Sequence, residues 1–419
     1  MNKLKQRILI SEDWTAVLLG AVIIAASIAG FIIFEPEFGW SNFADLQANV
    51  LNSENLGRIG IQFLAVLLIG FAGALLLSKP LKGFLIMFSV VFLITMVALL
   101  ITGNSSMEAL NLESVLFSLG LGLLIGNLFK LPEWFRGVLS TELFVKIGLV
   151  LLGTGIIFSN ILKAGALGLA QALIVVLSVW YFAFWLCKKL GIDKELTMMI
   201  SSAVSICGVS AAIATSGAIE GDSKKLSYVI SMVLITAIPM MIFMPMIAAY
   251  LNFPEEVTGA WLGGSIDTSG AVVASGSLVG ETALKISTIV KFSQNVLLGI
   301  AAFAISVYWT YTKKNEDGTD QLRPGLKVIW ERFPKFVLGF ILASLFFSFV
   351  LAPETVSEVK GSLKSIQTLW FSLAFTSIGL ETNFRELFIK QSRKPFYAFL
   401  IAQVFNVIVT LIVAMMLFG

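Results

Sequence analysis

Histidine is absent from the 419 residues, and charged residues make up only 13% of the chain. Without histidine the chain has no Ser-His-Asp triad, no His-Glu-x-x-His zinc site and no imidazole proton relay. The only two cysteines, Cys187 and Cys207, both lie in apolar stretches, so we expect neither a disulfide framework nor a metal cluster. Any proton or charge chemistry must therefore use carboxylates, lysines, hydroxyl groups or helix ends.

Hydrophobic residues dominate the composition: they make up 57% of the chain, and the mean hydropathy is +0.91. Soluble domains carry about 25% charged residues, and a membrane-spanning helix needs about 20 apolar residues. We therefore predict an all-α polytopic membrane protein with about 12–13 transmembrane helices. The apolar runs are residues 14–34, 60–78, 83–102, 109–129, 143–161, 165–187, 196–219, 226–251, 257–280, 283–310, 336–352, 365–381 and 396–418.

The charges between these runs predict an orientation. If every run crosses once, lysine and arginine fall on one side nearly throughout, which predicts a cytoplasmic N-terminus and a C-terminus on the outside. The first ten residues are basic but lack a small-residue cleavage site, so the first run is expected to be retained. We predict four regions, which are extra helices over 1–105, a first core part over 106–310, a cytoplasmic loop over 311–335 and C-terminal core helices over 336–419.

Two spans carry glycine and hydroxyl residues in their middle. One is Ser201–Ser210, with Ser205, Gly208 and Ser210, and the other is Gly259–Gly270. A helix opened in the membrane exposes backbone groups that lipid cannot satisfy, so such breaks occur where they are buried or line a wet cavity. Close helix packing is the alternative for small residues. The two readings are evenly balanced for the first segment, and a functional site is favoured for the second. For both segments, whether the chain spans the membrane fully or re-enters it is left open.

Asp267 is an aspartate in the middle of an apolar run, where an unpaired charge is costly. It could coordinate sodium, carry a proton or pair with a cation, and Ser265, Thr268 and Ser269 lie beside it. Alternatively it caps a half-helix that begins near Thr268.

Lys291 is the natural counter-charge. It lies roughly 12–15 Å into its run at 1.5 Å per residue, and Ser287, Lys291 and Asn295 share one helix face. A lysine this deep pairs, binds an anion or lines water, unless it snorkels to the surface.

A third candidate lies where the run 365–381 ends, at Glu381, Thr382 and Asn383. This end weakly echoes Leu152–Asn160, and an inverted repeat would place the two ends on opposite sides of the membrane. A plain helix C-terminus is the favoured alternative for Thr382 and Asn383.

From about residue 110 onward the sequence resembles the YeiH-like family of bacterial inner-membrane proteins, which are named as sulfate exporters. The resemblance rests on five motifs in the same order, which are Ile147–Gly153 with Phe158–Ile161, Ser205–Ala212, Gly263–Asp267 with Val272–Gly276, Ser287–Lys291 and Ile378–Phe384. It implies a secondary transporter, similar to folds with two inverted five-helix repeats and broken, crossed helices.

The chain departs from this family in two ways. Short members commonly carry His-Glu where Asp267 and Thr268 stand here, so a histidine mechanism does not carry over. An acid followed by hydroxyl groups suits sodium, a hard cation that prefers oxygen ligands, or a carboxylate proton. The first hundred residues or so exceed the short family pattern and are expected to form a scaffold or a homodimer contact.

The leading hypothesis is a secondary active transporter of a small anion (sulfate-like, sulfonate or carboxylate), coupled to sodium or protons. Its anion site would use Lys291, Ser205, Gly208, Ser210, Thr268, Ser269 and Asn295. Its coupling ion would use Asp267, Ser265, Thr382 and Asn383, with sodium at Asp267 and no other cofactor. The alternative is a passive anion channel. An enzyme is not expected, because only one aspartate is embedded and no Gly-x-Ser-x-Gly elbow is present.

Overall fold

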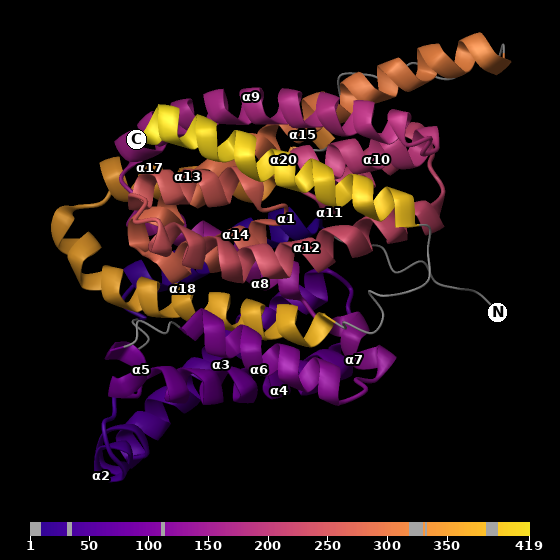
Figure 1. Ribbon diagram of the computed structural model, residues 1–419. Coiled ribbons are helices and arrows are strands. Elements are labelled where there is room, and N and C mark those ends of the chain that lie inside the picture. The colour runs from indigo at the N-terminus through magenta and orange to yellow at the C-terminus, as the bar shows by residue number, and fades with distance from the viewer. Residues whose placement is uncertain (1–9, 32–35, 110–113, 318–329, 332, 383–392) are drawn as a thin grey trace. The chain divides into compact units, whose positions relative to one another are not determined.

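The computed structural model describes residues 10–31, 36–109, 114–317, 330–331, 333–382 and 393–419 (Figure 1). The regular elements over these ranges are helices, which confirms the all-α polytopic membrane protein. Seven described helices are long and apolar enough to cross a membrane. They are Ser53–Leu76, Leu81–Thr102, Glu133–Gly155, Ile161–Lys189, Lys224–Tyr250, Glu281–Trp309 and Arg393–Phe418.

The other predicted runs are also helical but are interrupted, shorter or more polar than expected. Runs 196–219 and 257–280 are each split into two helices. The helices for 14–34, 109–129 and 336–352 are 17, 15 and 15 residues long. Hydropathy counts apolar residues and not the continuity of a helix, so it does not separate these elements from the seven long helices. The inverted five-helix repeats stay a prediction.

The helices form two compact units, whose limits differ from the predicted regions. Unit 1 comprises residues 1–158 and 335–383, and unit 2 comprises 159–334 and 384–419. The chain thus leaves unit 1 near Phe158, returns at Lys335 and leaves again after Asn383. The predicted loop 311–335 lies largely outside the described residues, and α15 continues to Asp317.

Unit 1 is built from the N-terminal helices and two later ones. These are α1 (Glu12–Ile28), α2 (Phe43–Asp45), the π-turn η1 (Leu46–Val50), α3 (Ser53–Leu76), α4 (Leu81–Thr102), α5 (Ser105–Ala109), α6 (Ser114–Leu128), α7 (Glu133–Val138), α8 (Thr141–Leu152), the 3₁₀ turn η2 (Gly153–Gly155), α17 (Lys335–Phe349) and α18 (Pro353–Glu381).

Close helix packing in unit 1 uses a pair of glycines. Gly122 and Gly126 of α6 face α18, and a Cβ at Gly122 would lie 2.4 Å from the carbonyl oxygen of Thr376. The backbones of α6 and α18 can meet only because no side chain separates them. The sequence pattern Gly-x-x-x-Gly therefore marks a packing contact here.

A half-buried ionic cluster joins α1 to α8 in the same unit. The Nζ of Lys146 lies 2.6 Å from a carboxylate oxygen of Glu12 and 3.0 Å from one of Asp13. The Asp13 carboxylate also accepts a hydrogen bond from the backbone N–H of Lys335, at 2.8 Å. The charges near the start of α1 thus fix it to both α8 and α17.

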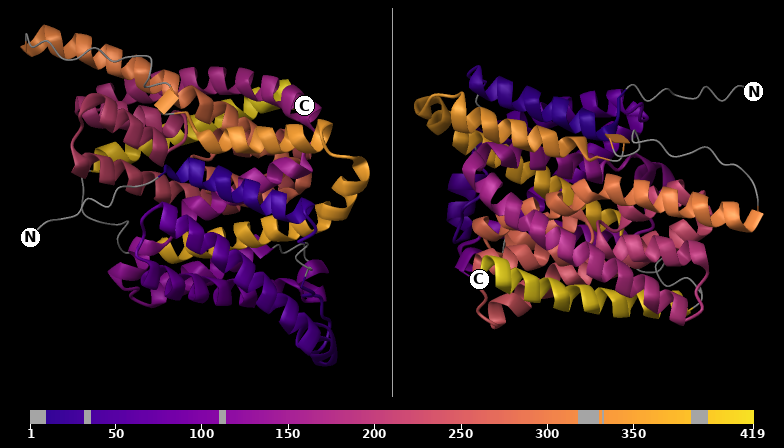
Figure 2. Two further views of the ribbon diagram at one scale, coloured as in Figure 1. Left: turned by 180° about the vertical axis from the view of Figure 1, so that it is seen from behind. Right: turned by 90° about the horizontal axis from the view of Figure 1, so that it is seen from above.

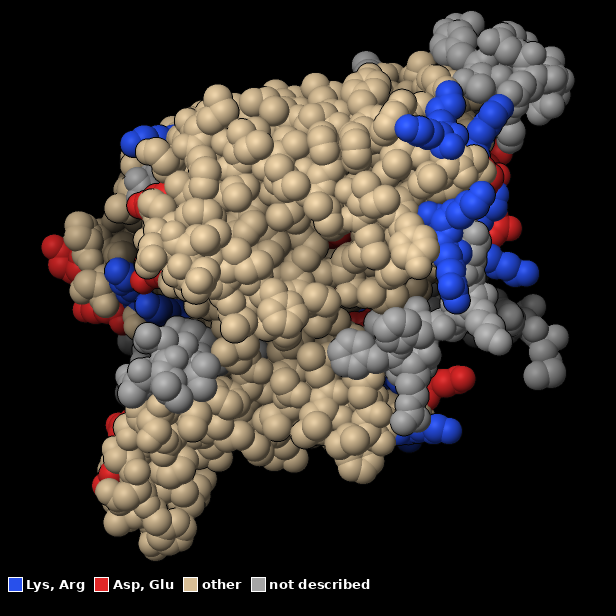
Figure 3. All heavy atoms as spheres, in the orientation of Figure 1, with Lys and Arg blue, Asp and Glu red and all other residues tan. Residues whose placement is uncertain are grey.

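Unit 2 contains the two split helices. Its elements are α9 (Phe158–Lys189), α10 (Lys194–Ser205), α11 (Val209–Ile219), α12 (Ser223–Tyr250), α13 (Glu255–Ser265), α14 (Ser269–Val279), α15 (Glu281–Asp317) and α20 (Arg393–Phe418). Figure 2 shows them from behind and from above. In Figure 3 the visible surface of α9, α12 and α20 is uncharged along its middle. Their basic residues lie near the helix ends, as expected of helices surrounded by lipid.

Glycine also brings the second split helix onto its neighbour. A Cβ at Gly263 of α13 would lie 2.4 Å from the carbonyl oxygen of Ser287 on α15. One at Gly276 of α14 would lie 2.5 Å from the Ser287 hydroxyl oxygen. Both halves of the split helix therefore lie directly on α15, which carries Lys291.

Candidate functional site

The first helix break separates α10 from α11 at Ile206–Gly208. Gly208 precedes α11 with φ +58° and ψ −108°, a conformation that side chains disfavour. A Cβ at this position would lie 2.6 Å from Val233 and 2.9 Å from the Cβ of Asp267. The two helix breaks are therefore in contact, which confirms the broken, crossed helices expected in this fold class.

The second break separates α13 from α14 at Ile266–Thr268. Thr268 caps α14, since its hydroxyl oxygen accepts a hydrogen bond from the backbone N–H of Ala271 at 3.3 Å. The alternative role of Asp267 as the helix cap is thus taken by Thr268. Asp267 is only 2% exposed, and its Oδ2 has no hydrogen-bond partner among the described residues.

Lys291 lies inside unit 2 and does not reach its surface. It is 1% exposed, and its Nζ donates to the carbonyl oxygen of Ile206 at 3.1 Å and to Oε1 of Gln294 at 2.6 Å. The Ile206 carbonyl is freed by the first break, so the ammonium group stabilises the negative end of α10. The snorkelling alternative for Lys291 is wrong.

Lys291 and Asp267 are close enough for an electrostatic interaction. No ion pair within 4.0 Å joins them among the salt bridges of the described residues, and Lys291 is instead hydrogen-bonded to neutral oxygens. Gln294, in turn, donates to the carbonyl oxygen of Gly264 at 2.9 Å. The side chains of α15 therefore connect the first break to the second.

Two amide side chains of α20 also bind the region where the two helix breaks meet, which we call the crossing. Nε2 of Gln403 donates to the carbonyl oxygen of Ser265 at 2.8 Å. Nδ2 of Asn406 donates to the carbonyl oxygens of Val204, at 3.1 Å, and of Ser265, at 3.2 Å. Asn406 therefore bridges both breaks. The sequence prediction missed these residues, although two amides three positions apart in the apolar run 396–418 were a usable signal.

Other predicted residues lie near the breaks but in different environments. Ser205, the last residue of α10, is buried and donates to the carbonyl oxygen of Ser201 at 2.7 Å. Ser269 accepts a hydrogen bond from Nδ2 of Asn295 at 3.2 Å, which ties the start of α14 to α15. Ser210, in the first turn of α11, is exposed on unit 2.

The predicted pair at the end of α18 belongs to the other unit. Thr382 is buried, and its hydroxyl group donates to the carbonyl oxygen of Ile378 at 2.8 Å. Its carbonyl oxygen accepts from Asn127 of α6 at 3.0 Å. These contacts describe a helix C-terminus held by unit 1. Asn383 lies outside the described residues.

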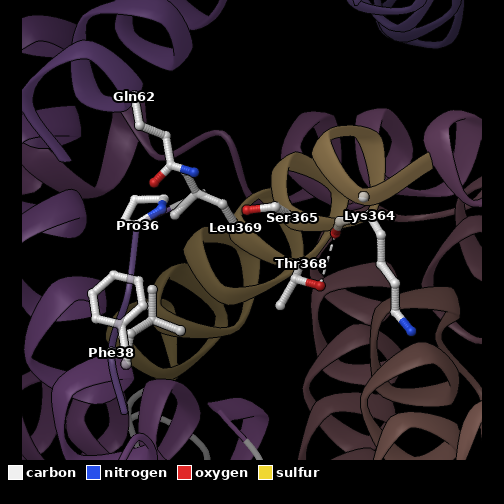
Figure 4. Close-up of a pocket in the computed structure, with 9 residues that line it drawn as sticks. Pro36, Phe38, Gln62, Lys364, Ser365, Thr368 and Leu369 are labelled. Carbon is white, nitrogen blue, oxygen red and sulfur yellow. Dashed lines mark hydrogen bonds between the residues drawn. The ribbon is translucent and has the colours of Figure 1, made fainter. Parts of the chain in front are cut away.

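A pocket in unit 1 contains none of the predicted site residues. It measures about 330 Å³ and lies between α3, α4 and α18 (Figure 4). Figure 4 shows Gln62 and Ser365 on its polar side, with Pro36 and Phe38 among the apolar residues that line it. Its lining residues come both from α3 and α4 of the predicted scaffold and from α18 of the predicted core, and none of them is a predicted site residue, so we place the candidate site at the crossing in unit 2.

The comparisons with known proteins concern most of the chain. Residues 86–399 match the family described as "Conserved hypothetical protein 698". A UPF0324 membrane protein of Rhodopirellula baltica is 38% identical over 380 residues, which cover 88% of this chain and 69% of that protein. No solved structure matches.

Two further relatives agree with this match. A UPF0324 membrane protein of Nitratidesulfovibrio vulgaris is 36% identical over 83% of this chain and 61% of its own length. One of Nitrosomonas europaea is 27% identical over 90% and 89%, respectively. The chain therefore spans less than two thirds of the Nitratidesulfovibrio relative. The YeiH-like proteins are this same family, so the resemblance is confirmed: the chain belongs to the UPF0324 family of membrane proteins.

Proposed function

We propose that this protein is a secondary active transporter that carries a small anion (sulfate-like, sulfonate or carboxylate) across the bacterial inner membrane. Sodium or protons would couple to the transport, and the N-terminus would lie in the cytoplasm. The observation that carries the proposal is the buried crossing of two broken helices, where Lys291 and Asp267 are 1% and 2% exposed.

The chemistry of this crossing suits an anion. The first backbone N–H groups of α11 point out of the helix into the break at Gly208, where the helix dipole favours negative charge. Lys291 provides a buried positive charge next to the same break, through its hydrogen bond to Ile206. An intramembrane charge pair of this kind is expensive to bury and is typical of substrate and ion pathways.

Flux into proteoliposomes tests the proposal. We would measure the uptake of labelled sulfate, methanesulfonate and succinate under an inward sodium gradient, an inward proton gradient or no gradient. We expect saturable uptake that one gradient accelerates and that unlabelled anion inside the vesicles stimulates. Uptake that does not saturate and shows no such stimulation would instead identify a passive anion channel.

Variants link the flux to the crossing. We expect Lys291→Gln and Asp267→Asn to reduce uptake at least tenfold, because each removes one charge of the buried pair. Lys285→Gln is the matched control, since Lys285 is also on α15 but pairs with Glu281 at 2.7 Å near the surface. Unchanged flux in both test variants would remove these residues from the mechanism.

A further inference from the structure

The oxygens around Asp267 suggest which ion couples. Several buried oxygens near the second break have no hydrogen-bond partner among the described residues, and they include Oδ2 of Asp267, Oγ of Ser265 and Oε1 of Gln403. Their residues are 2%, 1% and 4% exposed, respectively. Buried polar atoms normally have partners, and in a membrane interior each unsatisfied group costs several kcal/mol.

These oxygens come from side chains that lie next to one another. The amide N–H side of Gln403 faces the Asp267 carboxylate, and its Nε2 donates to the carbonyl oxygen of Ser265 at 2.8 Å. Ser265 ends α13 and is two residues from Asp267. The break thus brings one carboxylate and two neutral oxygen donors together. Oxygen donors of this kind are the ligands of hard cations.

The charge of this ligand set points to a monovalent cation. Asp267 is its only acid, and no group of three His, Cys, Asp or Glu residues that could hold a metal ion is present in the described part of the chain. Lys291 also interacts electrostatically with Asp267. A divalent ion would therefore place two positive charges beside an ammonium group and a single carboxylate, which is unfavourable at low dielectric constant.

We propose that the crossing holds a sodium site formed by Asp267, Ser265 and Gln403, and that Lys291 links its occupancy to that of the anion site. A carboxylate in a compact set of ligands favours the smaller of the two abundant monovalent cations, which is sodium. With the site empty, Asp267 and Lys291 sum to zero charge. Sodium alone leaves one positive charge in the interior, and a monovalent anion alone leaves one negative charge.

Binding both ligands restores neutrality, so each strengthens the binding of the other, and this strengthening is reciprocal. The linkage rests on the proposed transport of an anion, whereas the sodium site does not. Coupling between two sites is typically worth between about 5-fold and 150-fold in affinity. The same reasoning predicts that the positive charge of Lys291 weakens sodium binding when no anion is bound.

Thermal unfolding of the purified protein with sodium alone tests the site without any transport. We would titrate sodium gluconate against potassium gluconate at constant ionic strength and read the unfolding temperature from tryptophan fluorescence. Sodium binding to the folded state should raise the unfolding temperature. We expect no rise in Asp267→Asn and, in Ser265→Ala and Gln403→Leu, at least a tenfold higher sodium concentration for half of the effect.

Matched control variants distinguish residues that bind sodium from residues that only pack the helices. Gln171 is 0% exposed, its Nε2 donates to the carbonyl oxygen of Ala260 at 2.7 Å, and its Oε1 also lacks a partner among the described residues. Gln171→Leu therefore removes a similar amide on α9, and its response to sodium should match that of the unmodified protein. Lys291→Gln should respond to at least tenfold less sodium, because the opposing charge is gone.

The outcomes distinguish the two proposals. Equal stabilisation by sodium and potassium, or an unchanged sodium response in Ser265→Ala and Gln403→Leu, would overturn the sodium site and leave proton-coupled anion transport intact. A sodium response that needs these residues, in a protein that shows no anion flux, would support the site and overturn the proposed function. An unchanged sodium response in Lys291→Gln would overturn the link through that lysine.

Discussion

Gly208→Ala should destabilise unit 2, because Gly208 lies at the break between α10 and α11. Two costs add at this position. The backbone has φ +58° and ψ −108°, and holding a residue with a side chain in such a conformation costs about 1–3 kcal/mol. The new Cβ would also lie 2.6 Å from a methyl group of Val233 and 2.9 Å from the Cβ of Asp267, and overpacking costs about 1–3 kcal/mol.

Together the two effects amount to about 2–6 kcal/mol. At about 2–4 °C per kcal/mol for a unit of this size, the unfolding temperature should fall by between about 4 and 24 °C. The assay is thermal unfolding of the purified protein in detergent, followed by tryptophan fluorescence. One neighbour of the new methyl group is Asp267, which belongs to the proposed site, so anion flux should also fall.

Gly165→Ala is the control for this experiment. Gly165 is on α9 of the same unit, and a Cβ there would meet only a methyl group of Ile289, at 3.9 Å. Alanine is the better helix former by about 1 kcal/mol, so this variant should match or exceed the stability of the unmodified protein. If Gly208→Ala unfolds at the same temperature as Gly165→Ala, the strained contact between the two breaks is refuted.

Three further changes test other parts of the structure. Gly263→Leu should abolish correct folding, seen as aggregation on size-exclusion chromatography, because its Cβ would lie 2.4 Å from the carbonyl oxygen of Ser287. Asn406→Leu leaves two buried carbonyl groups without this donor, so thermal unfolding should show a loss of about 2–4 kcal/mol. Lys146→Met leaves the half-buried carboxylates of Glu12 and Asp13 without their ammonium partner and should cost about 1–3 kcal/mol in the same assay, because solvent screens part of the interaction, with little change in the sodium response of unit 2. Wild-type behaviour of any of these variants would contradict the contact on which it rests.

The sequence predicts both helix breaks but not their meeting. Glycine and hydroxyl residues in mid-span mark the breaks, because each removes a helix-stabilising side chain or offers a competing hydrogen bond. The contact of Gly208 with Asp267 joins positions 59 residues apart, since 267 − 208 = 59, and nothing in the spacing requires it. The prediction places Asp267 and Lys291 at one site because a buried charge needs a partner, and the structure brings their neighbourhoods together.

The limits of the two units were only partly predictable. The return to unit 1 at Lys335 coincides with the end of the hydrophilic segment 311–335, where a change of composition signals it. The departure near Phe158 lies inside the apolar run 143–161, where composition does not change. Hydropathy cannot find such a limit, because helices on both sides of it meet the same lipid.

The amide groups at the crossing explain why histidine is not needed to hold the helix breaks. Carbonyl groups freed by a helix break need donors, and here these are the ammonium group of Lys291 and the amides of Gln294, Gln403 and Asn406. An amide offers two N–H groups and an ammonium three, whereas a neutral imidazole offers one. Imidazole also changes its charge near neutral pH, whereas an amide does not. The donors that hold the breaks are therefore separate from Asp267, whose Oδ2 has no partner among the described residues, as the proposed sodium site requires.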